Sequence, residues 1–60
     1  MDKQDKILAF LMIAGRASTA RIAAAIKANQ WATERYLTQL LKQGRVRRTE
    51  ETRATYWESA

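Results

Sequence analysis

The chain has 60 residues, contains neither cysteine nor histidine, and carries a formal net charge of +5. A chain this short buries only about 60% of the surface that it exposes when unfolded, so we expect one small domain, residues 1–60, without a deep catalytic cleft. The missing residue types exclude a disulfide and a thiolate metal site, and they remove the commonest general base. We therefore expect neither an enzyme nor a cofactor.

The first predicted helix runs from Asp2 to about Ala14. Asp2 is suited to cap the amide of Asp5, and Gly15 is suited to end the helix. Between them, apolar side chains recur at the spacing of one helix face and are widened by two more: Ile7, Phe10, Leu11 and Ala14, with Leu8 and Met12. This spacing predicts one apolar face of an amphipathic helix.

A second, shorter helix is predicted from Ser18 to about Lys27, with Ser18 or Thr19 as its N-cap. The alanines in this segment are strong helix formers. Ile22 and Ile26 are four residues apart, so they lie on the same side and should face inward. The remaining side chains are small, which allows another helix to pack closely.

The third predicted helix runs from Gln30 to Gln43, between an Asn29 cap and a Gly44 stop. Its expected buried stripe ends with a tyrosine at one border: Thr33, Leu37, Leu40, Leu41 and Tyr36. At about 100° per residue, the opposite face is cationic, amide-bearing and aromatic: Trp31, Arg35, Thr38, Gln39 and Lys42. A helix that only packs and stays soluble usually carries glutamates on that face too, so we take it as a contact surface.

After Gly44, β-branched and aromatic residues predict two strands, 45–49 and 54–58, with residues 50–53 as a polar loop between them. A lone two-stranded hairpin would be unstable, so it should lean on the helices, with residues 16–18 as a third short strand. The order of elements predicts an α+β fold: a winged helix-turn-helix of three helices followed by a two-stranded antiparallel hairpin, the wing.

The positive charge is concentrated in the middle of the chain. From Arg16 to Arg48 there are eight lysines and arginines and a single acid, Glu34, whereas residues 49–60 hold three acids and one base. A localised basic block favours a polyanionic partner over a uniformly solvated surface. The alternative is that these side chains only solvate the helices.

In a helix-turn-helix, the second helix of the motif enters the major groove and its N-terminal half reaches the base edges. The candidate base-reading residues are Gln30, Trp31, Glu34, Arg35 and Gln39. Arg35 and Gln39 suit this role best, because arginine pairs bidentately with guanine and glutamine with adenine. Trp31 has two open interpretations, a DNA contact or a side chain folded back into the core.

Phosphate contacts position a protein on DNA without specifying sequence, and they need only exposed cations. The candidates are Arg21, Lys27, Lys42, Arg45, Arg47, Arg48 and Arg53. Arg53 lies near the predicted tip of the wing. Glu50 and Glu51 argue against a deeply inserted wing, because phosphates would repel them.

Four stretches, Lys6–Leu11, Ser18–Ala23, Arg35–Val46 and Ala54–Trp57, resemble small bacterial winged-helix regulators of fimbrial (pilus) operons. The Thr-Ala-x-Ile-Ala opening of the second helix and the terminal Ala-Thr-Tyr-Trp are the more specific parts. The resemblance implies a stand-alone domain that binds double-stranded DNA and acts on transcription, often beside a larger regulator on the same DNA. It also implies that the third helix supplies the reading residues, whereas the acids of the wing depart from the family.

The predicted function is therefore sequence-preferring duplex DNA binding by a cytoplasmic, nucleoid-associated regulator, either monomeric or as a homodimer on half-sites. The longest apolar run, Ile7 to Ala14, is too short to span a bilayer, so no membrane partner is expected. The main alternative is a winged-helix protein-interaction domain that does not touch DNA. Domains that bind left-handed nucleic acid share the pattern, but they need an Asn and a Tyr where Glu34 and Thr38 stand.

Overall fold

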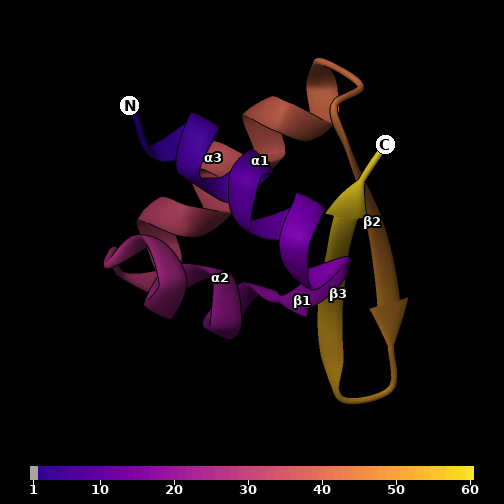
Figure 1. Ribbon diagram of the computed structural model, residues 1–60. Coiled ribbons are helices and arrows are strands. Elements are labelled where there is room, and N and C mark those ends of the chain that lie inside the picture. Colours follow the sequence, from indigo (N-terminus) through magenta and orange to yellow (C-terminus); the bar gives the residue numbers. More distant parts are fainter. Residues whose placement is uncertain (1) are drawn as a thin grey trace.

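The structure, a computed structural model, describes residues 2–60 and contains three helices and three strands in those residues. The elements follow in the order α1 (Lys3–Ala14), β1 (Arg16–Ser18), α2 (Thr19–Ile26), α3 (Gln30–Lys42), β2 (Val46–Glu51) and β3 (Ala54–Ser59). The helices gather on one side, and the β2–β3 hairpin extends along the other (Figure 1). This is the winged helix-turn-helix predicted from the sequence, with each helix boundary within a residue or so of its expected position.

Each helix begins at the side chain expected to cap it. Asp2, Ser18 and Asn29 accept hydrogen bonds from the backbone amides of the third residue along, at 2.8, 3.2 and 2.7 Å. These bonds satisfy amides that have no partner inside the helix. Lys27 ends α2 in the left-handed region at φ 57°, and its N–H reaches the carbonyls of Ala23 and Ala24. The caps therefore set both ends of the turn that joins α2 to α3.

The sheet has the strand order β1-β3-β2 and is antiparallel throughout. The third strand, β1, is present where the sequence placed it, and it pairs with β3 (Figure 1). The predicted loop over residues 50–53 is wrong, because Glu50 and Glu51 continue β2 and leave only Thr52 and Arg53 as the turn. Both acids have an arginine partner in the sheet, so their polarity does not stop the strand.

The core joins all the helices to the sheet. Its buried side chains are Ile7, Leu11, Ala17, Ile22, Ile26, Leu37, Leu40, Val46 and Trp57. The indole N–H of Trp57 donates a 2.8 Å hydrogen bond to the Thr19 hydroxyl, and both residues are buried. This bond links the wing to the first turn of α2, and it gives a buried polar group the partner that it needs.

Three residues of the predicted apolar faces lie at the surface, including Leu41, which the sequence placed in a buried stripe. Met12 is 78% exposed, Ala14 is exposed, and Leu41 is 37% exposed. A domain of this size has no second layer to cover α1, so only the narrow stripe of Ile7 and Leu11 is fully buried on that helix. Within residues 2–60, no helix has both the length and the apolarity needed to cross a membrane.

The Trp57–Thr19 bond makes a testable contribution to stability. Thr19→Val removes the acceptor and leaves the indole N–H buried without a partner, which should cost about 1–3 kcal/mol of unfolding free energy. Thr49→Val, at an exposed position of β2, is the matched control and should change stability by less than about 0.5 kcal/mol. Urea unfolding measures both, and equal effects of the two variants would contradict a specific role for the bond.

Candidate nucleic-acid interface

One face of α3 is buried along its length, and this burial determines which side chains of the helix point into solvent. Thr33, Leu37 and Leu40 are fully buried at successive turns, and the Thr33 hydroxyl donates to the carbonyl of Asn29 at 2.8 Å. Because these residues recur three or four positions apart, the side chains between them must point outward. The helix therefore cannot rotate about its axis without exposing its apolar stripe.

The outward face of α3 gathers the residues that the sequence singled out. One shallow hollow on this face is lined by Trp31, Glu34, Arg35, Thr38, Gln39 and Lys42, and all six are exposed. Four of the five base-reading candidates and one phosphate candidate thus lie together. The fifth base-reading candidate, Gln30, is exposed in the first turn of the same helix, outside the hollow. The surface is polar and cationic, with one aromatic ring.

The structure excludes one of the two interpretations left open for Trp31, the side chain folded back into the core. The residue is 66% exposed, so it is not part of the core. The Arg35 guanidinium carbon lies 5.1 Å from the centroid of the Trp31 ring, within the range of a cation–π contact. Side chains on a helix lean toward its N-terminus, so Arg35 leans back over the turn that carries Trp31. The pair is a preformed feature of the outward face.

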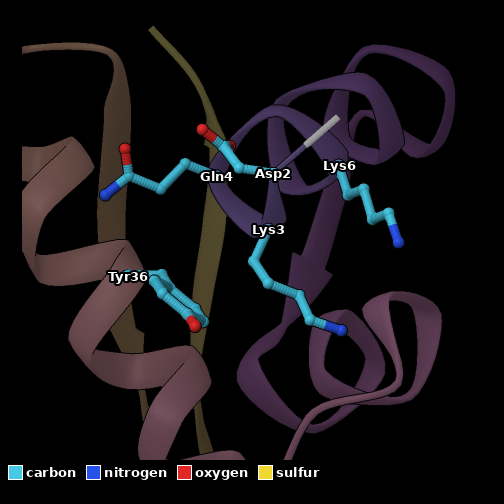
Figure 2. Close-up of a pocket in the computed structure, with 5 residues that line it drawn as sticks. All are labelled: Asp2, Lys3, Gln4, Lys6 and Tyr36. Carbon is cyan, nitrogen blue, oxygen red and sulfur yellow. The ribbon is translucent and has the colours of Figure 1, made fainter.

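Two contacts between the first turn of α1 and the other helices were not foreseen from the sequence. The Gln4 side-chain amide donates to the Gln39 side-chain oxygen at 2.6 Å, and Lys3 Nζ donates to the Ile26 carbonyl at 2.7 Å. Figure 2 shows Gln4 and Lys3 extending from α1 in different directions, whereas Lys6 points away from Tyr36. Such long-range pairs carry no periodic sequence signal. The first contact occupies one oxygen of a predicted base reader.

The pleat of β2 separates the arginines of the wing. Arg48 pairs in register with Trp57 and lies 6.0 Å from its ring, and it lines a hollow between α3 and the wing that also includes Glu34 and Thr38. Successive side chains on a strand point to opposite faces, so Arg47 lies on the other face of the sheet. Of these two predicted phosphate contacts, Arg48 lies on the side of α3.

Ion pairs involve only two of the arginines among residues 2–60. Arg48 pairs with Glu50, and Arg16 pairs with Glu51 while its guanidinium carbon lies 4.3 Å from the Tyr56 ring centroid. The side chains of both pairs are about half exposed, so each pair contributes little to stability. The other phosphate candidates are exposed and make no described ion pair: Arg21, Lys27, Lys42, Arg45, Arg47 and Arg53.

Comparison with known proteins identifies the family and the fold. A family model described as FaeA-like protein matches residues 3–60, almost the whole chain. No curated protein sequence matches the chain. Among solved structures, the adhesin competence repressor AdcR from Streptococcus pyogenes is 28% identical, with a TM-score of 0.88, and the match covers all of this chain and 46% of that one.

Two further structures were solved with DNA. ZitR from Lactococcus lactis, in complex with DNA, is 24% identical with a TM-score of 0.87, over 100% of this chain and 42% of that one. The Zalpha domain of PKZ from Carassius auratus, in complex with Z-DNA, is 24% identical with a TM-score of 0.88, over 97% of this chain and 92% of that one. At these identities, both likenesses show the fold alone. The chain spans less than half the length of AdcR and ZitR.

The capping of α3 positions this face and can be tested directly. Asn29→Ala removes the acceptor for the Ala32 amide, and we expect a loss of about 1 kcal/mol of unfolding free energy. For a domain of this size, that corresponds to a melting temperature lower by about 4–8 °C. Asn29→Asp should keep the cap and most of the stability. A melting temperature unchanged in Asn29→Ala would contradict the assigned role.

Proposed function

Because the chain belongs to the FaeA-like protein family, we propose that it is a transcription regulator that binds double-stranded DNA through the outward face of α3. The observation that carries the proposal is the arrangement of this face. Trp31, Arg35 and Lys42 are exposed together on a helix whose opposite side packs into the core. A rigid helix with cations and an aromatic ring on its free side suits the major groove.

We assign base reading to the N-terminal half of α3 and backbone contacts to its surroundings. Arg35 is the strongest candidate for guanine, and Gln30 and Trp31 lie in the turn that enters the groove first. The side-chain oxygen of Gln39 accepts a bond from Gln4, whereas its NH2 group can still donate to a base. Glu34 lines both the outward hollow and the hollow beside the wing, and its negative charge there would repel a DNA phosphate.

The proposed phosphate contacts come from α3 and from the elements on either side of it in the chain. Lys42 and Arg45 lie at its C-terminal end, Arg21 and Lys27 belong to α2 and its cap, and Arg48 and Arg53 belong to the wing. Arg47 lies on the other face of the sheet, so we expect it to contribute less to phosphate binding than Arg48. Cations on several elements around one reading helix would clamp the backbone on either side of the groove.

A protein-interaction domain is the weaker candidate. That alternative predicts an exposed apolar patch built from the aromatic residues. Tyr36 and Tyr56 are half-buried, however, and the exposed ring of Trp31 lies against Arg35. The structural neighbours also include a ZitR solved with DNA. Both observations favour a nucleic-acid partner.

One reading helix gives modest affinity, so we further propose that a second DNA-bound protein adds to it. The resemblance to fimbrial regulators favours a larger regulator on the same DNA, and a homodimer on two half-sites is the other arrangement. In either arrangement, we expect the protein to associate with the nucleoid. Analytical ultracentrifugation with and without duplex DNA separates these two arrangements.

The DNA-binding proposal predicts a salt-dependent affinity. In fluorescence anisotropy with a labelled duplex, log affinity should fall linearly with log salt concentration, by about 0.9 for each phosphate neutralised. Lys42→Ala should reduce that slope by about 0.9, the contribution of one phosphate contact. Lys6→Ala, at an exposed position of α1 that points away from α3 in Figure 2, is the charge-matched control and should leave the slope unchanged. Absence of binding to any duplex, even at low salt, would overturn the proposed function.

The acids of the wing give a separate prediction. Glu50→Gln removes the ion-pair partner of Arg48 and a negative charge, so affinity for duplex DNA should rise and the salt slope should steepen by up to about 0.9. Glu58→Gln is the control, because Glu58 pairs in register with Arg47 on the other face of the sheet. Equal effects of the two substitutions would show that only net charge matters and that the wing makes no specific contact.

A further inference from the structure

Trp31 and Arg35 form a unit whose geometry limits what it can recognise. The two residues are one helical turn apart, and the guanidinium carbon of Arg35 lies 5.1 Å from the centroid of the indole. The side chain of Arg35 therefore leans toward the N-terminus of α3, which is the end that reaches base edges in this fold. The contact orders a long side chain before any ligand is bound.

The contact uses one part of the guanidinium and leaves another available. A cation–π contact is an attraction to the ring that consumes no hydrogen bond, so it does not use up the N–H donors of the guanidinium. None of the hydrogen bonds or ion pairs described in residues 2–60 engages the Arg35 side chain. A planar fork with free donors matches the two acceptors, O6 and N7, that guanine presents in the major groove.

The indole supplies the second half of the unit. Trp31 is 66% exposed, which is unusual for so large an apolar side chain, and it lines the hollow together with Arg35. Base-edge groups that bury apolar surface in the major groove are few, and the principal one is the 5-methyl group of thymine. Because the ring lies beside the guanidinium, the methyl group that it reaches must belong to a base next to the guanine.

Two other groups that line the hollow are less suited to a bidentate bond with guanine. The side-chain oxygen of Gln39 already accepts the bond from Gln4, and Glu34 also lines the hollow on the side of the wing. A glutamate would pair with the amino group of cytosine rather than with guanine or thymine. The outward hollow thus holds an ordered guanidinium and an exposed aromatic surface, side by side.

We propose that Trp31 and Arg35 together read a guanine that is next to a thymine, with Arg35 bonded to the guanine and Trp31 packed on the thymine methyl. Trp31 is also the positioning residue for Arg35. The proposal rests on the proposed function and deepens it, because it names part of the sequence that the site prefers. It requires major-groove binding by α3 but no partner protein.

The first experiment finds a preferred duplex by selection from a random pool and then alters single groups on it. Selected duplexes should share a guanine with an adjacent thymine. Replacing that thymine with deoxyuridine removes only the methyl group, and the affinity should fall about fourfold. Replacing the guanine with 7-deazaguanine removes one acceptor, and the affinity should fall about fivefold or more.

Variants then separate the two roles. In Trp31→Ala, affinities for the thymine and deoxyuridine duplexes should become equal, and the penalty for 7-deazaguanine should shrink because Arg35 has lost its support. Trp31→Phe keeps an aromatic face and should restore both preferences. Arg35→Lys should lose the guanine preference and retain the response to the methyl group. Trp31 and Arg35 are both exposed, so these variants should melt at the temperature of the parent protein.

The outcomes distinguish this inference from the function on which it depends. Binding that is salt-dependent but indifferent to the methyl group at every thymine would overturn the inference and leave DNA binding intact. A methyl response that persists in Trp31→Ala would also overturn it, because another group would then make the contact. Failure to bind any duplex would overturn the proposed function itself.

Discussion

The burial of Thr33, Leu37 and Leu40 along one side of α3 is the constraint on which the rest of the structure depends. These side chains are fully buried on the side of α3 that contacts α1, α2 and the sheet, and within residues 2–60 no other element is available to replace those contacts. Removing one large core side chain typically costs 2–5 kcal/mol, which is a large part of the stability of so small a domain. The rotation of α3 is therefore set by its packing, and the outward direction of Arg35 and Lys42 follows from it.

The remaining elements hold this helix in place with few interactions. The caps at Ser18 and Asn29 set the two helix starts of the motif, and Trp57 joins the wing to α2 through the Thr19 hydroxyl. At the other end, Gln4 connects α1 to α3. The core lies between these contacts, so the outward face is presented by a scaffold that is supported on both sides.

The wing shows how a short sheet accommodates charge. Strand β2 carries arginines and glutamates at neighbouring positions. Glu50 pairs with Arg48 of the same strand, and Glu51 pairs with Arg16 of strand β1. Unpaired strand edges invite association with other chains, and charged side chains on an edge discourage it. In the proposed complex with DNA, each acid of the wing would both occupy an arginine and repel phosphate.

Local chemistry in the sequence was sufficient to predict most of the fold. Polar caps, glycine stops and the spacing of apolar residues gave three helices, a third strand and a wing, because these signals act over a few residues. The same periodicity placed Arg35 and Lys42 on the free side of α3. It did not decide the exposure of Met12 and was wrong for Leu41, because periodicity identifies an apolar face but not whether another element covers it.

Contacts between distant residues could only be decided by the tertiary structure. Three features depend on how separate segments of the chain meet. One is the bond between Gln4 and Gln39, and another is the side of the sheet on which Arg48 lies. The third is the continuation of β2 through Glu50 and Glu51. The exposure of Trp31 belongs to this group too, because residues near a helix start can turn either way from sequence alone. The sequence by itself determined the elements and the basic character of the third helix. Packing decided which of its side chains can reach a partner.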